Sequence, residues 1–142
     1  MQHVLLATDG SSGADRAADV AAKLAKSMGG RLSILTVGGN LSGDEMKQLA
    51  RAEGDVGNAL DALSEQVLAH AKQGAQRAGV SDVEVRAGWG DPAEVIIETA
   101  RRQQVDAIVM GRRGHGRLAG LLLGSVSQKV ASLAPCVVIL VP

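Results

Sequence analysis

Aromatic side chains are the scarcest in this 142-residue sequence. Trp89 is the only tryptophan, and the sequence contains no phenylalanine or tyrosine. Proteins that hold single-stranded nucleic acid usually stack its bases on aromatic rings. Fifteen basic and fifteen acidic residues cancel to a formal net charge of zero, so no overall electrostatic field attracts a polyanion. Both shortages argue against a protein that binds nucleic acid.

Cysteine is equally scarce, because Cys136 is the only one. A lone cysteine cannot form an internal disulfide or build a cysteine-rich metal site. No apolar run reaches the length that spans a bilayer, and the residues after Met1 lack the charged and apolar regions of a secretion signal. We therefore expect a cytoplasmic protein that does not insert into a membrane.

Segments that would divide the chain into domains are also missing. The sequence contains no tandem repeat, low-complexity tract or proline-rich linker. Its length is that of one ordinary domain, and an apolar fraction of 46% is enough for one buried core. We predict a single domain over residues 1–142.

Short apolar segments alternate with segments whose apolar residues recur at helical spacing. The expected strands are His3–Thr8, Arg31–Val37, Val83–Ala87, Val105–Met110 and Val137–Val141. The expected helices are 12–28, about 58–78, one that begins at Pro92, and Ser125–Leu133. Nearly continuous apolar strands are typical of a parallel sheet that helices cover on both faces. We predict a Rossmann-like α/β fold with an open five-stranded parallel sheet in the order 3-2-1-4-5.

Local signals mark where the first and third of these helices begin. Ser12 and Asp15 resemble a capping box at the start of the first helix. Asp91 followed by Pro92 supplies an N-cap and a proline in the first turn of the third. In the last helix, the apolar side chains expected to face inward are Val126, Val130 and Leu133.

The stretch GRRGHGRLAGLLLGSV, residues 111–126, gathers glycine and positive charge directly after the fourth expected strand. In an open α/β sheet, ligands bind beyond the carboxyl ends of the central strands, which here deliver Asp9 and Gly111. Glycines let backbone N–H groups approach a polyphosphate, and the positive end of a helix dipole stabilises its charge. The residues suited to these contacts are the glycines Gly111, Gly114 and Gly124 and the hydroxyl donors Ser125 and Ser127, with added charge from Arg112, Arg113 and Arg117.

Better-known phosphate motifs do not fit this stretch. Gly120–Ser125 lacks the lysine and the spacing of a P-loop. Residues 114–119 fit the loose G-x-G-x-x-A dinucleotide pattern, but no helix follows promptly and no acidic residue after Asp106 is available for a ribose. The paired histidines of HxGH nucleotidyl transferases are missing as well, because His115 stands alone.

One motif does match in full, namely G-x-x-G, nine residues, then G-[ST], formed by residues 111–114, 115–123 and 124–125. This motif resembles the nucleotide loop of the ATP-binding universal stress proteins. The segment HVLLATDGSS is similar to their first strand and turn, and GDPAEVIIETARRQQVDAIVMGRRGHG is similar to their Gly-Asp-Pro helix and the strand after it. The ending SVSQKVASLAPCVVILVP is similar to their last helix and strand. The resemblance covers nearly the whole chain and is weakest from residue 38 to about residue 56.

The resemblance implies a site for ATP or a related adenine nucleotide such as ADP, AMP or cyclic AMP. Val37 matches the position that holds the base, and Asp9 matches the aspartate placed near the ribose or a divalent metal such as Mg²⁺. The other matching positions are Ala7 and Thr8 at the first strand end, Met110, Gly111, Arg113 and Gly114 at the loop start, and Gly124, Ser125, Val126 and Ser127 around the phosphates. The family often carries other residues at positions 112 and 113, so the two arginines bear on which nucleotide is preferred.

The resemblance further implies a nucleotide-responsive regulator of the stress response that forms a homodimer by pairing its last strands, Val137–Val141. No nucleophile, general base or metal cluster is arranged for turnover, so we expect at most slow phosphate hydrolysis supported by Asp9 and a divalent ion. Two alternatives stay open. One is a slow nucleotide hydrolase or nucleotidyl transferase on the same fold. The other is an interaction module that regulates a transporter or enzyme through the leucine-bearing loop 118–123 or the last strand.

The remaining unusual residues have simpler interpretations. His115 is expected to be a solvated loop residue, and His3 and His70 show no partner pattern. Cys136 is expected to be a small buried apolar group. Trp89 could pack against the loop near the ligand or cover the sheet edge, and we expect the first.

Overall fold

The computed structural model describes residues 2–38, 56–112 and 124–142, with side chains described from residue 62 onward in the second range. In chain order its elements are β1 (His3–Ala7), α1 (Ser12–Met28), β2 (Arg31–Gly38), α3 (Val56–Arg77), β3 (Val83–Trp89), α4 (Pro92–Gln103), β4 (Ala107–Gly111), α5 (Ser125–Leu133) and β5 (Val137–Val141). The predicted alternation of strands and helices is confirmed in these ranges.

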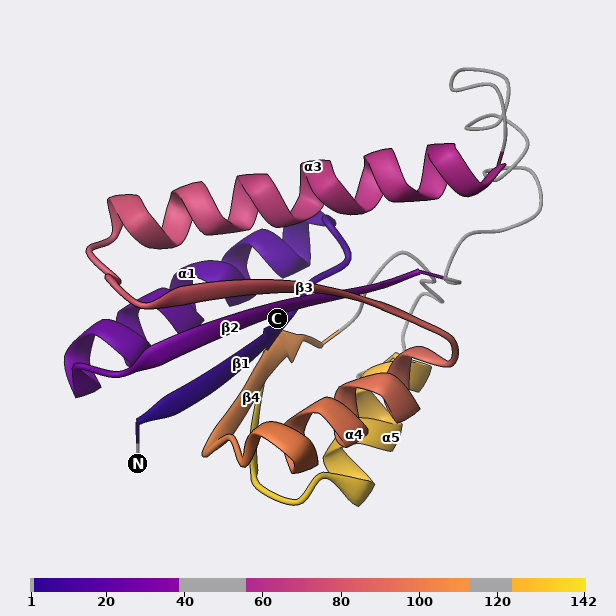
Figure 1. The fold of residues 1–142 in the computed structure, drawn as a ribbon. Coiled ribbons are helices and arrows are strands. Elements are labelled where there is room, and N and C mark those ends of the chain that lie inside the picture. Colours follow the sequence, from indigo (N-terminus) through magenta and orange to yellow (C-terminus); the bar gives the residue numbers. More distant parts are fainter. Residues whose placement is uncertain (1, 39–55, 113–123) are drawn as a thin grey trace.

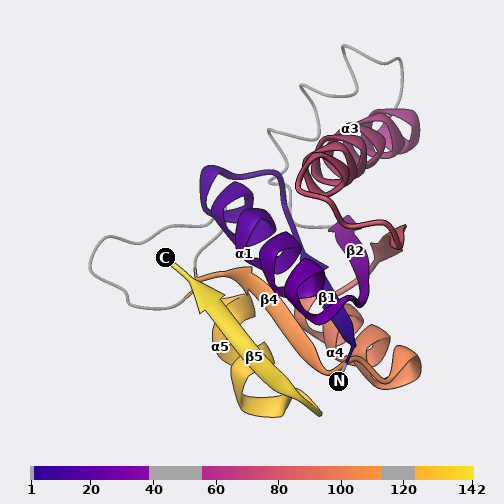
Figure 2. The ribbon, with the colours of Figure 1, turned by 90° about the vertical axis from the view of Figure 1, so that its left-hand side faces the viewer.

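The strands form a five-stranded sheet in the order β3-β2-β1-β4-β5, as predicted, and every neighbouring pair is parallel. In the centre of the sheet, Leu6 of β1 lies opposite Ile34 of β2 and Val109 of β4. Helices α1 and α3 cover one face, and α4 and α5 cover the other (Figures 1 and 2). Among the described residues, no helix is long and apolar enough to cross a membrane.

The core is divided into two layers by the sheet. Successive residues of a strand point to opposite faces, so Val4 and Leu6 of β1 join the layer under α1 and α3, while Leu5 joins the layer under α4 and α5. All three side chains are fully buried. A strand with apolar neighbours on both faces needs no polar alternation, which explains the continuous apolar run in the sequence.

The start of α1 differs by one residue from the predicted capping box. The N-cap is Ser11, whose hydroxyl accepts a hydrogen bond of 3.2 Å from the backbone N–H of Ala14. With the cap at Ser11, Asp15 falls in the fourth helical position and cannot return the bond that a capping box requires. The tight turn before the helix fixes this frame, because Gly10 adopts a left-handed φ of 79°.

The third predicted helix begins and ends as its sequence signals indicate. Asp91 is the N-cap of α4 and accepts from the backbone N–H of Glu94 at 3.0 Å, with Pro92 in the first turn. At the other end, Gln104 has a left-handed φ of 52° and Val105 donates its N–H back to Ala100 at 3.2 Å. Val105 therefore belongs to the turn that ends α4, and β4 begins later than predicted.

The inward face of α5 agrees with the prediction at two of its three positions. Val130 is fully buried and Val126 packs against the core below α4 and α5, but Leu133 is 58% exposed. At the end of the helix, Ala134 packs against this core in place of Leu133. A spacing of four residues keeps Val126, Val130 and Ala134 on one side of a helix, whereas Leu133 is rotated toward solvent.

The remaining single-residue predictions have mixed outcomes. Trp89 is 63% exposed and its ring lies over Gly38 of the neighbouring strand, where an added Cβ would collide with the ring. The loop against which we expected it to pack lies outside the described residues. Cys136 is half-buried against the core below α4 and α5, and burial raises the pKa of its thiol.

Candidate functional site

A cavity of about 240 Å³ opens at the carboxyl ends of the two central strands, β1 and β4. Parallel strands all deliver their carboxyl ends to the same edge, so the turns that follow them and the helices that begin there surround one space. The described residues that line it are Ala7, Thr8, Asp9, Ser11, Ala14, Leu35, Val37, Pro92, Ile96, Met110, Gly111, Arg112, Gly124, Ser125, Val126 and Ser127.

Every predicted site residue within the described ranges lines this cavity. They are Ala7, Thr8, Asp9, Val37, Met110, Gly111, Gly124, Ser125, Val126 and Ser127. Two further predicted residues, Arg113 and Gly114, lie outside the described residues. The sequence therefore predicts which parts of the chain meet.

The prediction did not name five lining residues, namely Ser11, Ala14, Leu35, Pro92 and Ile96, and it named Arg112 only as added charge. Four of them, Ser11, Ala14, Pro92 and Ile96, lie at the amino ends of α1 and α4, which begin at the same edge of the sheet. The signal for Pro92 was present in the sequence, because a helix that follows a parallel strand must start at its carboxyl end. Arg112 was noted for its charge, but sequence alone did not tell which arginine points inward.

The turn between β1 and α1 is held by its own side chains. The hydroxyl of Thr8 accepts from the N–H of Gly10 at 3.3 Å, and Oδ1 of Asp9 accepts from the N–H of Ser11 at 3.0 Å. The N–H of Thr8 also donates to the carbonyl of Leu35 at 2.9 Å, which extends the pairing of β1 with β2 by one residue. These bonds hold Thr8 and Asp9 in fixed positions at the cavity wall.

Across the cavity, the two ends of the glycine motif are joined directly. Gly124 donates its N–H to the carbonyl of Arg112 at 2.9 Å, and Arg112 donates its own N–H to Val141 of β5 at 2.7 Å. The hydroxyl of Ser127 also points to the carbonyls of Arg112 and Gly124. A hydroxyl has one proton to donate, so Ser127 joins the ends of the motif rather than offering this proton to a ligand. This corrects the expectation that both serines act as hydroxyl donors.

Three helices begin at the cavity, and their first turns differ in how their backbone N–H groups are satisfied. Ser11 caps α1 and Asp91 caps α4. The cap of α5 is Gly124, which makes no side-chain hydrogen bond to the helix. The first backbone N–H groups of α5 therefore have no side-chain cap, and the positive end of its dipole adds to theirs. This is the kind of helix end that binds anions.

Part of the cavity lining is apolar. Leu35, Val37, Ile96 and Met110 come from β2, α4 and β4 and belong to or pack against the core below α4 and α5. Aliphatic side chains of this kind can enclose a flat ring without stacking it on an aromatic one. The cavity thus has an apolar wall and a wall of backbone N–H groups, which suits a ligand with an apolar ring and an anionic group.

The described lining of the cavity carries few charges, and these charges are of opposite sign. Among the described lining residues, Asp9 carries the one carboxylate and Arg112 the one cationic side chain. No group of three or more histidine, cysteine, aspartate or glutamate side chains that could hold a metal occurs in the described part of the chain. A divalent ion here would need ligand oxygens from a bound anion in addition to Asp9.

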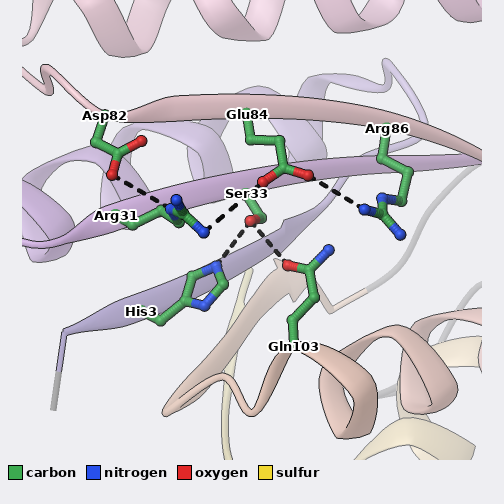
Figure 3. Close-up of polar contacts among 7 residues, drawn as sticks. All are labelled: His3, Arg31, Ser33, Asp82, Glu84, Arg86 and Gln103. Carbon is green, nitrogen blue, oxygen red and sulfur yellow. Dashed lines mark hydrogen bonds and ion pairs between the residues drawn. The ribbon is translucent and has the colours of Figure 1, made fainter.

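A second polar cluster lies at the amino ends of the strands (Figure 3). Nε2 of His3 lies 2.7 Å from the hydroxyl of Ser33, which donates to the side-chain carbonyl of Gln103 at 2.9 Å. Beside it, Arg31 pairs with Asp82 at 3.2 Å. Burial lowers the pKa of His3, and the Arg31 cation lowers it further. Sequence reasoning gave His3 no partner, because its partners are 30 and about 100 residues away.

The sheet order and the position of the cavity define a Rossmann-like α/β domain whose candidate site lies where the strand order reverses. The model of the universal stress protein family matches residues 1–142, so the chain belongs to this family. The universal stress protein YxiE of Bacillus subtilis (strain 168) is 34% identical over 154 residues, which cover 97% of each chain.

Two solved structures extend the comparison. The universal stress protein UspA from Lactobacillus plantarum has a TM-score of 0.82 at 21% identity, over 99% of this chain and 97% of its own, which shows a shared fold. A universal stress protein in complex with cAMP is 32% identical, with a TM-score of 0.74 over 99% of this chain and 97% of its own.

Proposed function

We propose that this protein binds an adenine nucleotide, with ATP as the expected ligand, and acts as a nucleotide-responsive regulator in the stress response. The observation that carries the proposal is the meeting of Asp9, Gly111 and Gly124 around one cavity whose other wall is apolar. Asp9 lies more than a hundred positions before the two glycines in the sequence.

Each wall of the cavity has a role in this proposal. The base lies against the aliphatic wall near Val37, the ribose lies near Asp9, and the phosphates lie at the start of α5 between Gly124 and Ser127. The uncapped N–H groups of α5 favour negative charge at that end. The relative that was solved in complex with cAMP supports an adenine nucleotide as the ligand class.

The described residues that line the cavity could hold Mg²⁺ only together with ligand oxygens from the nucleotide. One carboxylate, Asp9, lines the described cavity, and its Oδ1 already accepts from the N–H of Ser11. A magnesium ion keeps several waters and is commonly held by one or two carboxylates together with substrate phosphates. Such an ion would supply positive charge to the phosphates, with Asp9 as its carboxylate ligand.

We propose binding rather than efficient turnover. The hydroxyl of Ser127 donates to backbone carbonyls, and no histidine occurs among the described residues that line the cavity. A nucleophile activated by a neighbouring base is therefore not assembled in this part of the site. We also propose that the protein works in the cytoplasm, which is the compartment that a single half-buried cysteine fits.

A homodimer formed through β5 is the second part of the proposal. Both β3 and β5 are sheet edges, but β3 presents the charged side chains Glu84 and Arg86, whereas Val137–Val141 contains no charge. Charged side chains protect an edge strand from pairing with another chain. The uncharged edge of β5, with Val137 at 54% exposure, is the one that a second copy can extend.

The nucleotide proposal is tested by thermal unfolding with ATP, ADP, AMP and cyclic AMP, each with and without Mg²⁺. A ligand at about a hundred times its dissociation constant adds roughly 2.7 kcal/mol, which raises the midpoint by several degrees in a domain of this size. Protein free of co-purified nucleotide that none of these ligands stabilises would contradict the proposal.

A pair of variants locates the binding site. Ser125→Glu places a negative charge on an exposed residue that lines the cavity in the first turn of α5, where the helix dipole favours an acid. The variant should therefore fold normally and lose most of the nucleotide-induced shift through repulsion of the phosphates. Gln128→Glu is the matched control, because it adds the same charge to an exposed position one residue beyond the lining of the cavity. A shift that survives equally in both variants would place the ligand elsewhere.

A further inference from the structure

Lys129 of α5 forms a bridge to the start of α4. Its Nζ lies 3.6 Å from Oδ2 of Asp91 and 3.6 Å from Oε1 of Glu94. Asp91 is the N-cap of α4, and Glu94 lies in the first turn of the same helix. The proposed nucleotide contacts assign no role to any of these three side chains.

The two helix starts that Lys129 joins both line the cavity. Pro92 of α4 and Ser125 of α5 belong to the described lining, whereas Asp91, Glu94 and Lys129 do not. Lys129 follows Ser125 by four residues, so both lie on the same side of α5, and helical side chains lean toward the N-terminus of their helix. The ammonium group therefore contacts α4 beside the start of α5, outside the described lining of the cavity.

One carboxylate oxygen connects this bridge to the cap of α4. Oδ2 of Asp91 accepts from the backbone N–H of Glu94 at 3.0 Å, and the same oxygen lies within reach of Lys129. The capping bond fixes the Asp91 carboxylate relative to the backbone of α4. Lys129 therefore ties α5 to a group that moves with α4 as a whole.

The start of α5 depends on such contacts because its own cap gives it no side-chain support. Gly124 makes no side-chain hydrogen bond to the helix. On the side of β4, the hydroxyl of Ser127 points to the carbonyl of Arg112 and holds the helix there. On the side of α4, Lys129 supplies the corresponding contact. Donors that are held in place before a ligand arrives lose less entropy when it binds, so both contacts favour anion binding.

We propose that Lys129 is a positioning residue that, through Asp91 and Glu94, holds the uncapped start of α5 in the orientation that binds the phosphates of the nucleotide. The inference rests on the proposed nucleotide site and assigns a role to an ion-pair bridge outside its lining. All three side chains are partly exposed, so the effect on nucleotide affinity is about two- to fivefold, as for other ion pairs of this exposure.

The test is isothermal titration of the full chain with ATP at about 0.15 M salt, where exposed charges more than about 8 Å apart are largely screened. Lys129→Met removes the ammonium group and keeps most of the apolar stem, so the affinity for ATP should fall about two- to fivefold. Lys129→Arg keeps a cation that can reach both carboxylates, so this variant should bind ATP as the wild type does. Thermal unfolding without ligand verifies that each variant is folded at the temperature of the titration.

Glu94→Gln distinguishes positioning from a direct effect of the lysine charge on the phosphates. If Lys129 acted by its charge alone, removal of a neighbouring negative charge would raise the affinity for ATP. If Lys129 acts through α4, loss of this partner should lower the affinity by about twofold. Glu98→Gln is the matched control, because Glu98 lies one turn further along α4 and pairs with Arg101 and Arg102 of the same helix. This control should leave the affinity unchanged.

A double variant adds a readout that two independent structural defects would not give. When Lys129 is already methionine, Glu94 has no ammonium partner to lose, so Lys129→Met with Glu94→Gln should bind ATP no more weakly than Lys129→Met alone. Losses that multiply in the double variant would show that the two residues act separately, and would overturn the proposal.

The outcomes separate this inference from the proposed function. If the wild type, Lys129→Met and Glu94→Gln bind ATP equally well, the nucleotide site stands and Lys129 does not position it. A higher affinity in Glu94→Gln, or a loss in Lys129→Arg equal to that in Lys129→Met, would also refute the positioning role. If the wild type does not bind ATP, the proposed function fails and this inference fails with it.

Discussion

The hydroxyl of Ser127 offers a direct test of how the glycine motif is held at the cavity. Ser127 is 2% exposed, and its hydroxyl points to the carbonyls of Arg112 and Gly124, the two described residues that flank the loop. Ser127→Ala removes this donor and leaves the Arg112 carbonyl with the N–H of Gly124 as its remaining partner. The perturbation is therefore confined to one long-range hydrogen bond.

The expected magnitude follows from a comparison with Ser132 on the same helix. Ser132 is exposed, and its hydroxyl donates only to the carbonyl of Gln128, one turn earlier. Serine-to-alanine substitution improves helix propensity by similar amounts at both sites, so this effect cancels between the variants. The difference that remains is the buried bond, whose net contribution is about 1 kcal/mol. Ser127→Ala should be less stable than Ser132→Ala by this amount.

Urea unfolding followed by circular dichroism measures the difference. With a slope of about 1–3 kcal/mol per molar urea, a loss of about 1 kcal/mol lowers the midpoint by roughly 0.3–1 M at unchanged slope. Nucleotide affinity should also fall in Ser127→Ala and not in Ser132→Ala, because the hydroxyl positions the start of α5. Equal midpoints for the two variants would refute the reasoning, because the buried hydrogen bond of Ser127 would then stabilise the protein no more than the exposed bond of Ser132 does.

Two further predictions concern the sheet edge and the amino end of the sheet. The wild-type protein should sediment as a dimer, with twice the 14.5 kDa mass of one chain. Val137→Lys should dissociate this dimer, whereas Val85→Lys on the opposite edge of the sheet should not. A monomeric wild type would contradict the proposed dimer. Burial lowers the pKa of His3 below its unfolded value of about 6.5, so the unfolded chain takes up a proton more readily and stability falls as pH drops below that value. His3→Gln should flatten the unfolding midpoints measured between about pH 7 and 5, and midpoints that fall as steeply as those of the wild type would contradict this assignment.

The sequence predicts the layers of this fold because its alternation of apolar strands and amphipathic helices agrees with the topology of the sheet. Nearly continuous apolar strands predict a parallel sheet that helices cover on both faces, and Asp91 with Pro92 marks the start of α4 at the correct residue. Predictions failed where a choice of one residue decides the outcome. Ser11 and Ser12 are equally good caps by composition, and only the turn at Gly10 selects the first.

The sequence predicted those features of the candidate site that depend on the backbone topology and on the glycine motif. Asp9 and Gly124 line one cavity because parallel strands end at one edge, which is a property of the fold class. Side-chain direction was not predictable in this way. The hydroxyl of Ser127 turns toward a backbone carbonyl, and Arg112 reaches the cavity lining because strand pairing extends one residue beyond β4. Both outcomes depend on tertiary contacts that no local pattern encodes.

The two ends of the sheet explain why a ligand would occupy only one of them. At the amino end, polar groups satisfy one another, because the carboxylate of Asp106 accepts from the N–H groups of Gln2 and His3, and the hydroxyl of Ser33 bridges two side chains. At the carboxyl end, the start of α5 has no side-chain cap, and the buried Nε of Arg112 has no partner among the described residues. Unsatisfied donors are costly when they are buried, so a ligand that accepts from them gains most at this end. An anionic ligand at this end would accept from the backbone N–H groups at the start of α5, which no side chain caps.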